Sequence, residues 1–198
     1  LAAANDRISN AIAELPIFPC YSFDLGTLYG AVDGQKFGVE RPTVKARHSR
    51  KYFGRGKGVV AYTLLCNHVP LNGWIIGAHD FEAHHVFDVW YRNTSDIVPE
   101  AITGDMHSVN KANFAILHWF GRRFEPRFTD LEHQLGELHC ADDPALYEKF
   151  LVRPVGQVDL QIIADEKQNL DRIVATLGLK EMTQGTLIRK LCTYPQPN

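Results

Sequence analysis

Strand-type patterns fill the first half of this chain, and helical patterns fill the second half. Two turn signals divide the strand-rich half: the Asp33-Gly34 pair and the Val-Pro-Leu-Asn-Gly segment at residues 69–73. Runs of β-type residues separated by such signals predict consecutive antiparallel strands. The predicted runs are residues 28–32, 35–39, 58–66 and 74–78.

Helical spacing of apolar residues begins at residues 81–91. A short strand is predicted at residues 100–103, and Ser108 is a suitable N-cap for a helix over residues 109–120 that Gly121 would end. One more strand is predicted at residues 123–128, followed by helices over residues 131–138, 144–151, 158–163, 170–177 and 183–191.

This order of elements predicts an α/β fold. An antiparallel meander joined to parallel strands by crossover helices is typical of a ribonuclease-H-like mixed sheet. We therefore expect three antiparallel strands plus two parallel strands, with flanking helices and a C-terminal helical insertion. The expected divisions are a lead-in segment at residues 1–22, the core at residues 23–130 and the helical insertion at residues 131–198.

The charges of the chain are strongly segregated. Its 21 Lys and Arg against 23 Asp and Glu give a formal net charge of −2, which excludes a histone-like, basic protein. Residues 36–57 nevertheless carry eight basic residues and one acid, or +7, whereas residues 125–171 carry eleven acids and four basic residues, or −7. Such segregation indicates one side that faces a polyanion. The eight basic residues are Lys36, Arg41, Lys45, Arg47, Arg50, Lys51, Arg55 and Lys57.

The same basic segment contains two aromatic residues, Tyr52 and Phe53, and several glycines. Aromatic rings can stack on bases or sugars, and glycines allow the backbone to approach phosphates. The segment is not a nucleotide-binding phosphate loop, because Gly58 is followed by Val59 and not by Lys and Ser or Thr. It therefore predicts contact with a DNA backbone, and a solvated surface loop without a partner is the alternative.

Asp33 and Asp105 both lie where a predicted strand turns or ends. Two carboxylates that come together from separate strands repel each other unless a cation joins them. Mg²⁺ accepts such oxygen ligands and keeps water molecules for chemistry. The alternative is structural: Asp33 begins a turn and Asp105 precedes a helix.

A second polar group combines His79, Asp80, His84, His85 and Asp88. His84 and Asp88 would share one face of a helix, so a metal-dependent hydrolase is a further hypothesis. The group lacks the H-E-x-x-H pattern of zinc proteases. Polar residues on an exposed or half-buried helix face are the simpler interpretation.

Several motifs together resemble the Tn-three family of bacterial transposases. They include Tyr-Gly-Ala-Val-Asp-Gly-Gln-Lys-Phe at residues 29–37 and Thr-Gly-Asp-Met-His-Ser-Val-Asn-Lys-Ala-Asn-Phe at residues 103–114. Others occur in the same order, so the resemblance is specific and covers nearly the whole chain. These are residues 51–56, 91–94, 124–128 and 178–190.

The resemblance implies a DDE catalytic domain. Such a domain cleaves transposon DNA ends and joins the 3′-hydroxyl to target DNA by metal-dependent phosphoryl transfer. The catalytic and metal-binding acids of the family fall on Asp33, in the D-G-x-x-F motif, and on Asp105, in the T-G-D motif. Its third acid, a Glu, has no match here. The isolated chain is therefore expected to be inactive, and a DNA-binding or assembly module is the alternative.

The resemblance also implies the cofactor and partners. The metal would be Mg²⁺, for which Mn²⁺ can substitute, and the partners would be transposon-end and target DNA and a second copy of the parent protein. The implied location is the bacterial cytoplasm, in association with the nucleoid. The longest apolar run, at residues 59–66, is too short to cross a membrane. Because the chain begins with Leu1 and ends at Asn198, we interpret it as an excised part of a longer protein.

Overall fold

The computed structural model describes residues 2–22, 26–41 and 43–192. Contacts divide the chain into two compact units, Leu1–Arg127 with Thr183–Asn198, and Phe128–Met182. The C-terminal helix thus belongs with the N-terminal unit and not with the segment that precedes it. The domain boundary expected at residue 23, and residues 193–198 of the expected helical insertion, lie outside the described residues.

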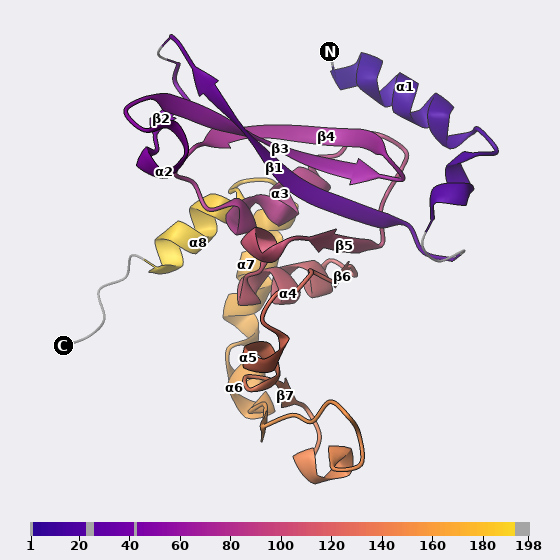
Figure 1. Ribbon diagram of the computed structural model, residues 1–198. Helices are drawn as coiled ribbons and strands as arrows, with labels where there is room; N and C mark the ends of the chain where they lie inside the picture. The colour runs from indigo at the N-terminus through magenta and orange to yellow at the C-terminus, as the bar shows by residue number, and fades with distance from the viewer. Residues whose placement is uncertain (1, 23–25, 42, 193–198) are drawn as a thin grey trace. The chain divides into compact units, whose positions relative to one another are not determined.

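The first unit is built on a mixed sheet (Figure 1). Five of its strands lie in the order β4, β3, β1, β5, β6, and the two-residue strand β2 also pairs with β3. The first three strands of this order are antiparallel, and β5 and β6 are parallel to β1. The predicted three antiparallel and two parallel strands are therefore present in an α/β arrangement. The strands are β1 (Tyr29–Val39), β2 (Arg47–His48), β3 (Lys57–Cys66), β4 (Val69–Gly77), β5 (Ala101–Gly104) and β6 (Arg123–Phe124).

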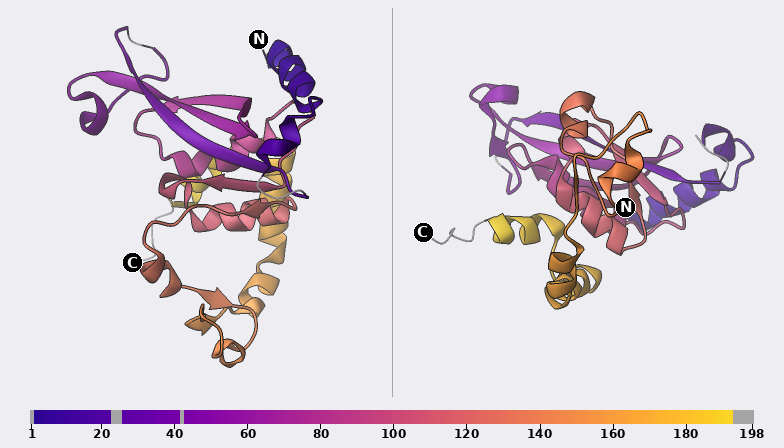
Figure 2. Two further views of the ribbon diagram at one scale, coloured as in Figure 1. Left: turned by 45° about the vertical axis from the view of Figure 1, so that its right-hand side comes forward. Right: turned by 90° about the horizontal axis from the view of Figure 1, so that it is seen from below.

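Helices cover one face of this sheet. The α3 helix contacts β3 and β4, α4 contacts β6, and the two helices contact each other (Figures 1 and 2). The α1 helix contacts the edge strand β4, and α8 contacts η2 and α3. The helices of this unit are α1 (Ala2–Ala13), η1 (Phe18–Tyr21), α2 (Arg50–Phe53), η2 (Glu82–His85), α3 (Val86–Tyr91), η3 (Met106–Ser108), α4 (Lys111–Trp119) and α8 (Gln184–Cys192).

The second unit contains short helices and one small pair of strands. The helices expected at residues 131–138 and 144–151 are shorter than predicted, the one expected at 158–163 begins and ends two residues later, and the one expected at 170–177 is longer at both ends. The parallel pairing of His139 and Cys140 with Gly156 and Gln157 was not expected. The elements are α5 (Leu131–Leu135), β7 (His139–Cys140), η4 (Pro144–Tyr147), β8 (Gly156–Gln157), α6 (Leu160–Asp165) and α7 (Lys167–Gly178).

The core lies between the covered face of the sheet and the helices. Along β3 the side chains of Val60, Tyr62 and Leu64 are buried, and the residues between them are half-buried. On β1, Val32 faces the same core, whereas Asp33 lies on the opposite, exposed face. This alternation of period two is what allows a charged residue inside a long central strand.

One correction concerns Asp33-Gly34, which does not form a turn. The β1 strand runs through both residues, and its pairing with β3 includes Asp33 opposite Thr63 and Gly34 opposite Tyr62. The long antiparallel ladder outweighs the local turn preference. Glycine serves a different purpose here, because a Cβ at residue 34 would lie 2.3 Å from an Oε atom of Glu82.

A second correction concerns residues 69–73, which begin β4 and are not a turn. The turn lies just before them, at Asn67 and His68, whose φ angles are 47° and 67°. Positive φ at both central residues suits a tight hairpin between twisted strands. Pro70 is tolerated because β4 is an edge strand.

A third correction concerns the N-cap of α4. Ser108 is buried in η3, and the cap is Asn110, whose side chain accepts a hydrogen bond from the Ala112 N–H at 2.8 Å. The predicted end at Gly121 is confirmed by its φ of 69°. The start was misplaced because a 3-10 turn separates β5 from the helix.

Candidate active site

Asp33 and Asp105 occupy equivalent positions on neighbouring parallel strands. The last paired residues of β1 and β5 are Val32 and Gly104. Asp33 is the next residue after Val32, and Asp105 is the next residue after Gly104. The backbone at Asp105 is still extended, with φ −78° and ψ −174°. Adjacent strands lie about 4.8 Å apart, and residues in register point to the same face. The two predicted acids thus occupy corresponding positions, Asp33 within β1 and Asp105 directly after the adjacent strand β5.

Both carboxylates are exposed and locally oriented. An oxygen of Asp33 accepts a hydrogen bond from the Gly34 N–H at 2.8 Å. In Asp105, Oδ1 accepts from the His107 N–H at 3.0 Å, and Oδ2 lies 2.8 Å from Nδ1 of His107. The sequence interpretation missed His107 as a partner of Asp105, although its position two residues downstream was a usable signal.

A chain of buried polar side chains lies beneath the Asp105 turn. The Ser108 hydroxyl lies 3.4 Å from that of Tyr62. Asn113 donates to the Ser108 carbonyl at 2.8 Å and to the Ala83 carbonyl at 2.9 Å. Gln184 of α8 in turn donates to the side-chain oxygen of Asn113. These contacts connect α8 to the turn that carries Asp105.

The first residues of α8 are held by α3. Gln184 is fully buried, and its side-chain oxygen accepts from the Phe87 N–H at 2.8 Å. Asp88 is 3% exposed and accepts from the N–H groups of Gln184 and Gly185, at 3.0 and 3.4 Å. Burial raises the pKa of Asp88, while these two hydrogen bonds and the charge of Arg92 act in the opposite direction.

Lys36 differs from the other basic residues of the predicted DNA-binding set. Its Nζ atom lies 2.8 Å from Glu82 and 4.6 Å from the centre of the Tyr52 ring. Burial lowers the pKa of Lys36, but the hydrogen bond and the charge of Glu82 outweigh it, so the pKa is raised. Lys36 is thus a charged, partnered residue on the covered face.

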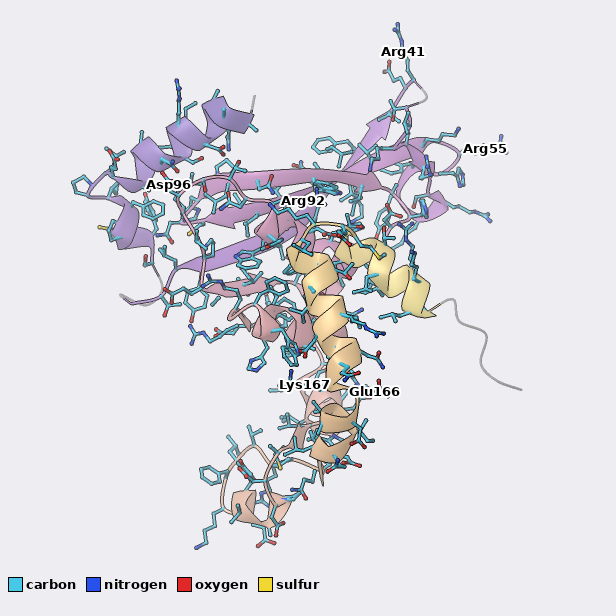
Figure 3. The ribbon with its side chains drawn as sticks, turned by 180° about the vertical axis from the view of Figure 1, so that it is seen from behind. Arg41, Arg55, Arg92, Asp96, Glu166 and Lys167 are labelled. Carbon is cyan, nitrogen blue, oxygen red and sulfur yellow. The ribbon has the colours of Figure 1, made fainter. Side chains whose placement is uncertain are left out.

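The other seven basic residues lie on the connection between β1 and β3 and on the strand ends beside it. Figure 3 shows Arg41 and Arg55 pointing outward from this end of the sheet. Arg47 of β2 donates to the carbonyls of Val44 and Ala46, at 2.8 and 3.0 Å. The seven are Arg41, Lys45, Arg47, Arg50, Lys51, Arg55 and Lys57.

The histidine-rich group does not form the metal site of the hydrolase hypothesis. Asp88 is buried, and its carboxylate accepts the backbone N–H groups of α8. Within the described residues, no cluster of three or more His, Cys, Asp or Glu side chains is arranged to hold a metal ion. Asp88 was therefore wrongly assigned to a half-exposed helix face, and its role is to hold α8.

His85 predicts a specific loss of stability in acid. Burial lowers its pKa to about 4. An unfolded histidine, with a pKa near 6.5, takes up its proton first, so the folded state is favoured above pH 6.5 and loses up to about 3 kcal/mol as the pH falls to 4. The charged groups that face His85 are Asp80, which opposes the shift, and His84, Lys45 and Arg189, which add to it.

Urea unfolding at pH 7, 5.5 and 4.5 measures this effect. The His85→Gln variant should lose less stability over this range than the wild type does. His118→Gln, at an exposed position of α4, serves as the control and should leave the pH dependence unchanged. Equal slopes for wild type and His85→Gln would contradict the prediction.

Comparison with known proteins assigns the chain to the transposases. The family described as "Tn3 transposase DDE domain" matches residues 1–198. The chain belongs to this family, as the motifs around Asp33 and Asp105 had indicated.

Curated relatives give the same result. The chain is 28% identical over 196 residues to the transposase for transposon Tn4556 of Streptomyces fradiae, covering 98% of this chain and 21% of that protein. It is 23% identical over 169 residues to the transposase for transposon Tn501 of Pseudomonas aeruginosa, with 84% and 17% covered. For the transposase of gamma-delta from Escherichia coli K12, the identity is 22% over 200 residues, with 100% and 19% covered.

The chain thus spans about a fifth of the length of the relatives it matches. No solved structure matches it significantly. In the part of the chain that the structure describes, no helix combines the length and the apolar character required for a membrane span.

Proposed function

We propose that this chain carries part of the active site of a transposase that cleaves transposon DNA ends and joins the resulting 3′-hydroxyl to target DNA. The observation that carries the proposal is the register of β1 and β5, in which the residues just before Asp33 and Asp105, Val32 and Gly104, are paired. The family match and the named relatives support it. The test is strand cleavage by the parent protein after Asp33→Asn or Asp105→Asn, where loss of cleavage with retained DNA binding is expected.

The proposed fold is ribonuclease-H-like. The strand order β4, β3, β1, β5, β6, with the first three strands antiparallel and the others parallel to β1, supports it. In such a core one acid lies on a central strand and the other directly after the neighbouring strand, as Asp33 and Asp105 do relative to β1 and β5. We further propose residues 23–130 as the core, residues 1–22 as its lead-in and residues 131–198 as the helical insertion, whose last helix, α8, returns to the compact unit that contains the core.

The two carboxylates fit a hard divalent ion, proposed to be Mg²⁺ with Mn²⁺ as a substitute. They are exposed, lie on adjacent strands and offer oxygen donors, which both ions prefer. A bound ion would supply neutralisation of the charge that develops on the phosphodiester during transfer.

The chain's own residues then prepare this site. The His107 backbone N–H fixes one oxygen of Asp105, and the His107 ring fixes the other. Asp33 is held in the middle of a paired strand, so neither carboxylate has to be ordered at the moment of reaction. Sequence matching finds no counterpart of the family's Glu, and we therefore expect no cleavage by the 198-residue chain alone.

The proposed DNA-binding surface consists of the seven basic residues on the connection between β1 and β3 and on the adjacent strand ends. In the 198-residue chain, replacing Arg55 and Lys57 together by Gln should lower the affinity for duplex DNA and reduce the slope of log K against log salt by about two. Fluorescence anisotropy with a labelled duplex at several salt concentrations measures both. Lys149→Gln with Arg153→Gln removes two charges from the acidic unit and should leave the slope unchanged.

A salt-independent affinity of the wild-type chain would contradict the DNA-binding proposal. The alternative function, a DNA-binding or assembly module without chemistry, is favoured by the same basic surface. It differs in one outcome: cleavage by the parent protein would survive the loss of Asp33 or Asp105. The parent is further proposed to act as a dimer on transposon-end and target DNA, in the bacterial cytoplasm at the nucleoid. The names of its bacterial relatives support the transposase role.

A further inference from the structure

A polar cavity of about 300 Å³ lies at the edge of the sheet, apart from the two acids. Strands β4 and β2 pair with consecutive stretches of the same edge of β3, and the cavity forms where the pairing changes from β4 to β2. The segment before β2, the end of β4, η2 and the first turns of α8 supply its walls, and all of them belong to one compact unit. Its charged and titratable side chains are Lys45, Arg47, His79, Asp80, His85 and Arg189.

Two glycines allow these side chains to converge. A Cβ at Gly77 would lie 2.9 Å from Cγ of Arg47 and 3.2 Å from the His79 ring. A Cβ at Gly185 would lie 3.0 Å from Cε1 of His85. A side chain at either position would require Arg47 or His85 to shift from its present place.

Positive charge dominates the cavity. Lys45, Arg47 and Arg189 face a single carboxylate, that of Asp80, which already accepts the Gly77 N–H at 2.9 Å. The charges of Arg189 and Lys45 add to burial in lowering the pKa of His85. A positive potential in a partly enclosed site attracts anions strongly.

Hydrogen-bonding groups are also available at the cavity. The Nδ1 atom of His85 is buried, and no residue within the described part of the chain pairs with it. The hydroxyl oxygen of Thr186 accepts from Thr183 at 2.9 Å and from Arg189 at 3.5 Å. Its own proton is therefore left to donate to a ligand.

We propose that this cavity binds a phosphodiester group of a nucleic-acid backbone. Arg47 and Arg189 supply guanidinium groups, a shape that matches phosphate oxygens, Lys45 adds a point charge, and Thr186 adds a hydroxyl donor. Within the chain Arg47 also donates to the Val44 and Ala46 carbonyls, and Arg189 donates to the Gly185 carbonyl at 3.2 Å. The inference rests on the proposed function, because it takes DNA as the ligand. It adds a second anchoring point that includes Arg189, which comes from a helix more than a hundred residues after the basic segment.

The position of the cavity determines what it can do. Strand β3 separates the cavity from β1, the strand that carries Asp33. Two strand spacings make the distance between the cavity and β1 about 10 Å or more. A phosphate held there is not the reacting one. Helices η2 and α8 wall the cavity, and Asp33 lies on the opposite, exposed face of the sheet, so a phosphate held there belongs to a flanking stretch of nucleic acid and contributes affinity.

The test compares Arg189→Gln with Arg172→Gln in the 198-residue chain. Both remove one exposed arginine charge, but Arg172 lies on α7, outside the cavity. Anisotropy of a labelled duplex should show about a tenfold loss of affinity at 0.1 M salt and a slope smaller by about one for Arg189→Gln only. Lys45→Gln, in an exposed loop, should behave like Arg189→Gln, and circular dichroism confirms that each variant is folded.

The outcomes separate the cavity from the wider proposal. If the wild type binds the duplex and Arg189→Gln matches Arg172→Gln, the cavity inference is overturned while DNA binding stands. If the wild type does not bind the duplex, both fail. Inorganic phosphate at constant ionic strength should compete weakly with the duplex in the wild type; tight phosphate binding without any duplex binding would identify a free phosphate as the ligand and overturn the nucleic-acid assignment.

Discussion

Replacing Asp33 or Asp105 by Asn in the parent protein should reduce cleavage of a transposon-end duplex by about a thousandfold or more. Asn keeps the size and one oxygen of Asp, but it removes the negative charge that holds a divalent ion. Both residues are proposed to hold the same ion, so the two variants should lose activity to a similar extent. Gel analysis of an end-labelled duplex in Mg²⁺ measures the loss.

The control for this prediction is Asp96→Asn. Asp96 is exposed, and its carboxylate accepts from the Asn10 side chain at 2.6 Å, an interaction that an amide oxygen can retain (Figure 3). The Asp96→Asn variant of the parent protein loses one negative charge, as the other two variants do, and should cleave at the wild-type rate. Binding of the duplex should stay within about twofold for all three variants, because phosphate contacts come from basic residues. Full cleavage by Asp33→Asn would refute the assignment of the site.

Replacing Gln184 by Ala should destabilise the folded chain by roughly 3 kcal/mol. The Gln184 side chain accepts from the Phe87 N–H and donates to Asn113, and all of these groups are buried. Its loss leaves a backbone donor and an amide oxygen without partners in a dry core. In a chain of this size, the midpoint of thermal unfolding should fall by about 6–12 °C.

The matched control is Gln161→Ala on α6. Gln161 is exposed, and its side chain donates to Asp165 at 2.8 Å, whereas its backbone N–H, which the variant keeps, donates to Asp159. Its loss should change stability by less than about 0.5 kcal/mol. If Gln184→Ala unfolds at the temperature of the wild type, water replaces the side chain and the network does not support α8.

Local patterns predicted the strands well where a periodic apolar run coincided with a long ladder. The run at residues 58–66 became β3 because alternate side chains could be buried against α3. At Asp33-Gly34 the same reasoning failed, since pairing with Thr63 and Tyr62 outweighed a two-residue turn signal. Local residue preferences contain no information about pairing between strands that are far apart in the sequence, and here that pairing determined the structure.

The sequence predicted the two acidic residues of the candidate site, but it did not predict the residues that surround and support them. Asp105 follows a strand in a recognisable motif, whereas the support for its turn comes from Gln184 on another helix. The Phe87–Gln184 hydrogen bond joins residues 97 positions apart, and no spacing rule reports a contact of that range. Arg189 escaped notice for the same reason, because its neighbours at the cavity come from distant segments.

The segment Phe128–Met182 leaves and re-enters one compact unit at two fixed points. The Arg127 N–H donates to the Gly104 carbonyl at 2.8 Å on the way out, and the Gln184 N–H donates to Asp88 at 3.0 Å on the way back. Doubling the length of a loop whose two ends are fixed costs only about 0.6 kcal/mol of loop-closure entropy. This part of the sequence can therefore be lengthened, shortened or exchanged in evolution, and it is the natural place to insert a fluorescent reporter.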